Sequence, residues 1–184
     1  MTSSDDLFVF YDTETTGLDI NFSQIIQIGS VLTDSNFKIL DELNLNSQVL
    51  PWVVPSPDAF LIHKQTACLE NGLSHFEMMR TLREKWLSWG KEKNLIFVSY
   101  NGHRFDEELV RRQFYWNLFD PYITNTNGNR RLDLMSLFQI IGNFFDSKIK
   151  VPKDDEENIS LKLTDLAKEN LSLIHISEPT RRVF

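Results

Sequence analysis

Residues 7–14 read LFVFYDTE, in which five apolar or aromatic residues run directly into two acids that flank a threonine. Such a run predicts a β-strand that is covered on both faces. Because side chains alternate along a strand, we expect Asp12 and Glu14 to point to the same side, about 7 Å apart along the backbone. Two like charges at the end of a buried strand repel each other and lose hydration, so a divalent cation would compensate them. The alternative is that both acids face water in a turn.

Composition places the chain among soluble globular proteins. Its 184 residues are 41% hydrophobic and 24% charged, which suits one domain with a sizeable core. Cys68 is the only cysteine, so no internal disulfide is possible. No apolar run reaches the ~18 residues that span a membrane, and the first residues are polar and acidic, unlike a signal peptide. We therefore expect a cytoplasmic monomer with no membrane partner.

The net charge of −7 argues against a stand-alone nucleic-acid binder with a basic face. It does not exclude an enzyme that holds a phosphodiester through metal ions, because the acids of such a site make the chain more acidic while bound cations supply the positive field.

The hydrophobic pattern predicts an alternation of strands and helices. Residues 25–33 and 37–45 read as two strands of a hairpin, and residues 95–100 (LIFVSY) as a buried central strand. The proline-rich residues 50–62 read as a loop. Helices are predicted over 74–93, 106–118, 133–145 and 160–170. In the first of these helices, the apolar side chains spaced by three and four residues are assigned to the core: Phe76, Met79, Leu82, Trp86 and Trp89.

This order is a mixed α/β pattern, and it brings two polar segments together. The first strand and the strand at 95–100 are joined through a helix, so they are expected to be parallel neighbours. Their carboxyl ends then lie side by side, where open α/β sheets bind ligands. Asp12 and Glu14 occupy one end, and Asp106 follows the other. Asp106 also suits the first turn of a helix, where acids are ordinary, but its spacing favours a shared site.

Two segments carry a resemblance to a known family. FVFYDTETTG (residues 8–17) resembles the first motif of the DEDD (DnaQ-like) 3′–5′ exonucleases, and SYNGHRFDEELVRRQFYWNLFDPY (residues 99–122) resembles their second motif in its bacterial exonuclease I form. RLDL at 131–134 fits the next helix of that family, and LIHKQT at 61–66 fits a loop before the long helix.

The resemblance implies a ribonuclease H-like fold, with a five-stranded mixed sheet whose second strand is antiparallel and which is flanked by helices. It also implies two Mg²⁺ ions, with Mn²⁺ able to substitute, held by four acids. Three of these acids transfer to this chain, as both catalytic residues and metal ligands: Asp12, Glu14 and Asp106. The implied partner is the 3′ end of single-stranded DNA, and single-strand-binding protein would join it in a full-length enzyme.

The same resemblance implies a set of substrate-binding residues: Thr13, His63, Asn101, Arg104 and Phe105. Thr13 would offer its backbone near the 3′ end, while Asn101 and Phe105 would shape the second motif. Arg104 could touch phosphates. His63 matches a loop that lies against the terminal nucleotide, although without the family it reads as a surface loop residue. Hard oxygen ligands suit Mg²⁺, and two such ions can stabilise both the attacking and the leaving oxygen of a phosphodiester.

The chain departs from the family in its last segment. The third motif, His-x-x-x-x-Asp, would supply the general base and the fourth metal ligand, but five residues after His175 stands Thr180. LSLIHISEPTR at 171–181 looks like the translation of a sequencing adapter, against the alternative of a divergent natural tail. We therefore expect an exonuclease domain over 1–170 that is incomplete at its C-terminus, a non-native tail over 171–184, and inactive or impaired catalysis.

Two other functions stay open at this point. An RNA-trimming 3′–5′ exonuclease would share the fold, although the DPY segment at 120–122 argues against it. A non-catalytic nucleic-acid-binding fragment is compatible with the missing third motif, whereas the two intact acidic motifs argue for catalytic ancestry.

Overall fold

The computed structural model describes residues 6–63, 72–145, 149–153 and 158–170. The chain divides into two compact units, Met1–Leu132 and Asp133–Phe184. The expected adapter-derived tail at 171–184 lies outside the described residues, so its origin stays a prediction. Within the part that the structure describes, no helix is both long enough and apolar enough to cross a membrane.

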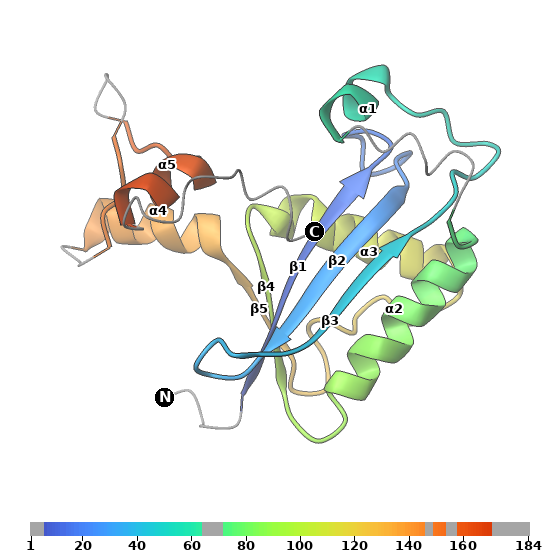
Figure 1. Cartoon of the computed structure of the whole chain (residues 1–184), viewed down its shortest axis with the longest axis horizontal. Helices are drawn as coiled ribbons and strands as arrows, with labels where there is room; N and C mark the ends of the chain where they lie inside the picture. Colours follow the sequence, from blue (N-terminus) through green and yellow to red (C-terminus); the bar gives the residue numbers. More distant parts are fainter. Residues whose placement is uncertain (1–5, 64–71, 146–148, 154–157, 171–184) are drawn as a thin grey trace. The chain divides into compact units, whose positions relative to one another are not determined.

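A five-stranded sheet in the order β3-β2-β1-β4-β5 forms the first unit (Figure 1). The central strand β1 (Leu7–Thr15) pairs antiparallel with β2 (Ile25–Thr33) and parallel with β4 (Leu95–Ser99). The edge strand β3 (Ile39–Asn46) continues the hairpin from β2, and β5 (Arg130–Asp133) forms the other edge. The predicted mixed sheet with an antiparallel second strand is confirmed.

The two faces of β1 differ, so the prediction of a strand covered on both faces is only half right. Val9 and Tyr11 are buried in the main core, under the helices. Phe8 and Phe10, on the alternate face, are half-buried and contact the Phe37 ring, with centroids 5.6 Å and 6.2 Å away. Because Phe37 lies in the β2–β3 turn and is 65% exposed, the described residues of the first unit cover this second face with a hairpin edge and not with a full layer.

Helix α2 (His75–Trp89) covers the main core and begins as the sequence predicts. The Ser74 hydroxyl accepts from the Glu77 backbone N–H, and the Glu77 carboxylate accepts from the Ser74 N–H, which completes a capping box. Four of the five predicted core residues are buried: Met79, Leu82, Trp86 and Trp89. The fifth assignment is wrong: Phe76 is 48% exposed and packs against Phe119, while Met78 takes a core position.

Other boundaries differ from the sequence patterns for identifiable reasons. Part of the predicted loop at 50–62 is helix α1 (Pro57–His63), because proline at the first helical position fits the fixed φ of the helix and gives up no needed N–H. Helix α3 (Asp106–Trp116) ends two residues before the predicted boundary, where the Asn117 N–H turns back to Gln113. These shifts leave the predicted element order intact.

In the second unit, the predicted helix at 133–145 is α4 (Leu134–Phe144). The resemblance places the RLDL segment in this helix, but its first three residues belong to strand β5. Asp133 ends the strand and caps the helix by accepting from the Met135 N–H at 3.0 Å. The predicted helix at 160–170 is α5 (Leu163–Asn170), which begins later than expected. None of the described residues of α4 is fully buried.

A buried polar relay ties α2, α3 and β2 together. The Gln113 side-chain oxygen accepts from the Ile25 N–H at 3.0 Å and lies 2.7 Å from His75 Nε2. Asn117 Nδ2 lies 3.3 Å from His75 Nδ1. Since the Gln113 oxygen can only accept, His75 donates through Nε2 and stays neutral, with Nδ1 as the acceptor. Burial lowers the pKa of His75 below its ordinary value of 6.5.

We expect this relay to make the folded state acid-sensitive. Below pH 6.5 the unfolded chain protonates His75 while the folded chain resists, so the free energy of unfolding falls by up to about 1.4 kcal/mol per pH unit until the folded pKa is reached. Urea unfolding between pH 7 and pH 5 measures this slope. His75→Gln should flatten it relative to the matched variant His103→Gln, which removes an exposed histidine. An equal slope in both variants would contradict the assignment.

Candidate active site where β1 and β4 part

The candidate site lies where the central strand β1 extends beyond the end of its parallel neighbour β4. The β1–β4 pairing ends at Phe10 opposite Val98, and β4 itself ends at Ser99. Beyond that point β1 continues with β2 alone as its partner, and Asp12 is opposite Gly29. Asp12 and Glu14 therefore border the opening left by the departing strand, as expected for ligand sites at the carboxyl ends of parallel strands.

The chain leaves β4 through a very tight turn. Asn101 adopts the left-handed conformation (φ 60°), which asparagine tolerates, and a single 3₁₀ turn follows at Gly102–Arg104. A Cβ atom on Gly102 would lie 2.4 Å from Ser99 Oγ and 3.2 Å from Asp106 Oδ2. Glycine is thus required for the turn to close on the end of β4, and the closure brings the first residue of α3 back to β1.

The two acidic motifs meet at one hydrogen bond. The Thr13 hydroxyl donates to Asp106 Oδ1, and Thr13 is the residue between Asp12 and Glu14. This contact brings Asp106 to the strand that bears the other two acids, while the sequence-based expectation that the three carboxylates share one metal site stays a prediction. Asp106 is also the first residue of α3, so its role at the positive end of the helix holds as well.

The electrostatics of the three carboxylates favour a cation. Burial raises the pKa of Asp106 to about 6, with the Thr13 hydrogen bond opposing the rise and the charge of Asp12 adding to it. Desolvation also raises the pKa of Asp12, and desolvation followed by the Asp12 charge raises that of Glu14. Each anion is therefore less stable here than in water, and a hard cation bound beside it would stabilise it. The donor set is pure carboxylate oxygen, which fits Mg²⁺.

The three described acids are not arranged closely enough to bind one metal ion together. Among the described residues, no group of three histidine, cysteine or acidic side chains is close enough to hold a metal ion. The reason lies in the strand geometry: Thr13 occupies one Asp106 oxygen, and side-chain alternation sends Thr13 to the opposite side from Asp12 and Glu14. The ligand assignment thus stays a prediction.

The predicted substrate-binding residues lie in three different places: on β1, in the turn before α3, and at the end of α1. Thr13 is committed to Asp106 through its side chain. Asn101, Arg104 and Phe105 lie in the turn that leads to Asp106; Asn101 and Arg104 are exposed, and Phe105 is half-buried against the core. His63 ends α1 in place of the expected loop, and its side chain lies outside the described part.

Glu107 is a buried acid next to the candidate site that the sequence patterns did not single out. Its side chain is fully buried and accepts from the Tyr11 hydroxyl at 2.9 Å, from the Thr124 hydroxyl and from Arg131 at 3.2 Å. Burial, followed by the negative charge of Glu107, raises the pKa of Tyr11 well above its usual value. These contacts clamp the first turn of α3 to β1 and β5 and so fix the position of Asp106. Residues 106–108 are all acids, and the sequence alone does not indicate that Glu107 is the one whose side chain is buried in this network.

Comparisons with known proteins agree with this geometry. A sequence profile described as Exonuclease matches residues 9–169. The chain belongs to the exonuclease family. Exodeoxyribonuclease I of Buchnera aphidicola subsp. Acyrthosiphon pisum (strain APS) is 30% identical over 175 residues, which are 92% of this chain and 41% of that protein. The chain thus spans about two fifths of the length of that curated relative.

Solved exonuclease structures share the fold. E. coli exonuclease I in complex with an oligonucleotide is 25% identical, with a TM-score of 0.80 over 90% of this chain and 36% of that one. An ExoI/SSB-Ct complex is 24% identical, with a TM-score of 0.81 over the same shares of the two chains, and it shows likeness of fold alone. The ribonuclease H-like fold is therefore confirmed, and exonucleases of this family are metal-dependent.

We expect Gly102→Ala to disturb the exonuclease site through packing alone. The new methyl group overlaps Ser99, so the turn must open and carry Asp106 away from Thr13, at a cost of about 1–3 kcal/mol. Urea unfolding measures the loss. The double variant Ser99→Gly with Gly102→Ala removes the overlapping atoms and should recover most of it. Failure of the second change to help would show that the close approach to Ser99 is not the constraint.

Proposed function

We propose that this chain is a 3′–5′ exonuclease domain that removes nucleotides from the 3′ end of single-stranded DNA with the help of two Mg²⁺ ions. The observation that carries the proposal is the hydrogen bond from Thr13 to Asp106, because it joins the second acidic motif to the strand that bears the first. Support comes from relatives named exodeoxyribonuclease I and from the oligonucleotide complex of a structural neighbour.

In this proposal Asp12, Glu14 and Asp106 hold the ions through carboxylate oxygens. The chemistry that such a pair supplies when bound is stabilisation of both the attacking and the leaving oxygen of the phosphodiester. The chain itself orients the 3′ terminal nucleotide. Thr13 presents its backbone to the 3′ end, the exposed Arg104 meets a phosphate, and Asn101 and Phe105 shape the turn around them. His63 belongs to the same proposed set at the end of α1.

The proposed domain has no His-x-x-x-x-Asp motif, the motif that in this family would supply the acceptor for the proton of the attacking water. No histidine of this sequence is followed five residues later by aspartate. Loss of a general base lowers a rate by about 10²–10⁴-fold, so the chain as given is proposed to bind metal and DNA while cutting slowly.

The proposed partners are a single-stranded DNA 3′ end and, for a longer protein, single-strand-binding protein, as in the ExoI/SSB-Ct complex of the neighbour. We propose that the chain acts as a monomer in the cytoplasm. An RNA-trimming activity is the second candidate, because 3′–5′ exoribonucleases would share this fold.

We expect Mg²⁺ uptake to depend on the two motifs together. Asp12→Asn and Asp106→Asn should each lower the Mg²⁺ affinity measured by calorimetry by more than the about 10–100-fold typical of outer-shell changes, because each removes a charged ligand. Mn²⁺ should behave in the same way. Glu92→Gln, which removes one exposed acid elsewhere, is the matched control. If all three variants bind Mg²⁺ like the wild type, the metal assignment fails and a non-catalytic role is favoured.

Substrate preference has its own test. In Mg²⁺, the wild-type chain should shorten a single-stranded DNA from the 3′ end slowly and leave an RNA of the same sequence longer, as gel electrophoresis of 5′-labelled strands would show. Asp106→Asn should abolish the shortening, which excludes a contaminating nuclease. Faster loss of the RNA would establish the RNA-trimming candidate instead.

A further inference from the structure

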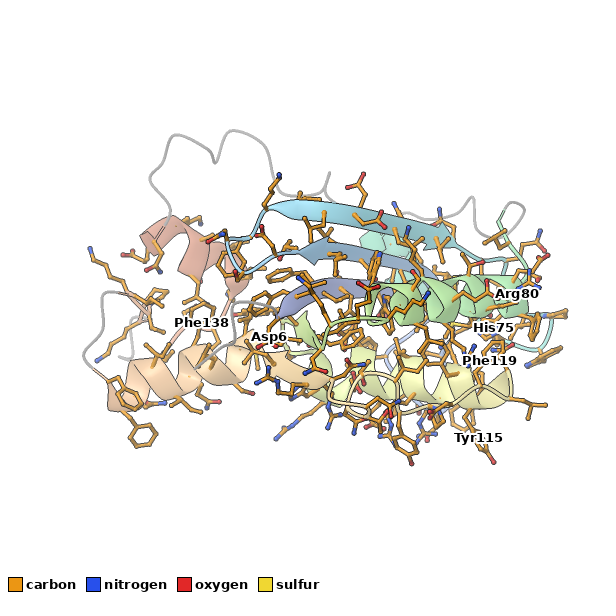
Figure 2. All side chains as sticks on the ribbon, turned by 90° about the horizontal axis from the view of Figure 1, so that it is seen from below. Asp6, His75, Arg80, Tyr115, Phe119 and Phe138 are labelled. Carbon is orange, nitrogen blue, oxygen red and sulfur yellow. The ribbon has the colours of Figure 1, made fainter. Side chains whose placement is uncertain are left out.

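An arginine–aromatic face lies on α2 and on the residues that follow α3, outside the candidate active site. The Arg80 guanidinium lies 6.0 Å from the centre of the Phe76 ring, and Arg83 lies 5.5 Å from that of Phe119. The two rings are themselves 5.5 Å apart, so the four side chains form one connected set. Figure 2 shows Arg80 and Phe119 at the same end of the molecule as His75.

The positive charge of this face is only partly offset by the acids of α2. Arg111, Arg130, Arg131 and Lys85 each form an ion pair with an acid, but neither Arg80 nor Arg83 does so with any described residue. The nearest acid to show an effect is Glu77, whose carboxylate is engaged with Ser74. Even in a chain of net charge −7, this helix face thus presents two guanidinium groups that form no ion pair with a described acid.

A groove of about 610 Å³ adjoins this face, and Phe76 belongs to both. Three large rings in its wall are open to solvent: Trp52 is 74% exposed, Phe76 48% and Trp116 42%. Apolar rings of this size are unfavourable in water, so a flat apolar surface that covers them lowers the free energy. The Asn117 side chain, beside the His75 relay, adds a polar group to the same wall.

We propose that the arginine–aromatic face and its groove bind the single-stranded polynucleotide away from its 3′ end. Arg80 and Arg83 contact successive phosphates, and the exposed rings stack on bases, which is how proteins hold single strands without reading sequence. This inference rests on the proposed function. The eleven residues of α3 separate the groove from Asp106 by about 16 Å, so only a strand several nucleotides long reaches both.

A polynucleotide fits these features better than an acidic peptide does. Arg80 and Arg83 are three residues apart on α2 and so project from the same side, as a regularly charged backbone requires. Each base also offers two flat apolar faces to a ring, whereas aspartate and glutamate offer none. The exposed rings would stay uncovered under an acidic peptide.

The test is the salt dependence of binding, measured by fluorescence anisotropy without metal on an oligodeoxynucleotide of about 16 nucleotides. The double variant Arg80→Ala with Arg83→Ala should bind more weakly, and its slope of log affinity against log salt should be smaller by about 1.4, or 0.7 per lost phosphate contact. The ratio of the wild-type affinity to the affinity of the double variant then falls about 25-fold between 0.05 M and 0.5 M salt. Alanine keeps the helix, and Arg80→Lys with Arg83→Lys should restore the slope.

The matched control removes the same charge elsewhere. Lys91→Ala with Lys93→Ala acts in the exposed turn after α2 and should leave the slope within error of the wild type. An arginine double variant that behaves like this control would overturn the inference. So would tighter binding of poly-glutamate than of DNA at equal charge, which would mark an acidic protein as the partner. Because the measurement omits metal, it is independent of the Mg²⁺ calorimetry on which the proposed function depends.

Discussion

The hydrogen bond between Thr13 and Asp106 is the constraint on which the site depends. It links a residue of the central strand to the first residue of α3, and two other features exist to make it possible. The pairing of β4 with β1 stops two residues before Asp12, which opens the space, and Gly102 lets the chain turn sharply enough to return. A longer β4 or a bulkier residue 102 would leave the two acidic motifs apart.

This arrangement opposes folding at neutral pH. Burial raises the pKa of Asp106 from 3.8 in the unfolded chain to about 6 in the folded chain. The protonated carboxyl group therefore stabilises the folded state fully at pH values below 3.8, and this contribution is lost as the pH rises through 6. At pH 7 Asp106 is therefore a buried anion that must be held in place. Glu107 does so through its bonds to Tyr11 and Arg131, which anchor the first turn of α3 on two strands. Perturbed carboxylates supported by such a clamp are typical of functional sites.

Periodicity predicted most of the fold and the two acidic segments of the site, because both depend on local patterns. The apolar run at residues 7–11 predicts a strand, and the capping box at Ser74 predicts where α2 begins. The predictions were wrong or incomplete where contacts between residues far apart in the sequence determine which side chain is buried. Phe76 continues the apolar spacing of α2 but contacts Phe119, and the choice of Glu107 as the buried acid depends on Tyr11 and Arg131. Neither partner can be inferred from spacing along one element.

Helix α3 connects the two places where this chain would meet its substrate. Its first turn carries Asp106, and its last turns carry Gln113, which bonds to the start of β2 and to His75 at the head of α2. Both ends are thus fixed to the same sheet, so the spacing between the candidate centre and the arginine–aromatic face is set by a rigid element. A strand held at both points would have its 3′ end positioned by contacts on bases that do not react, which is how remote binding lowers the entropic cost of alignment.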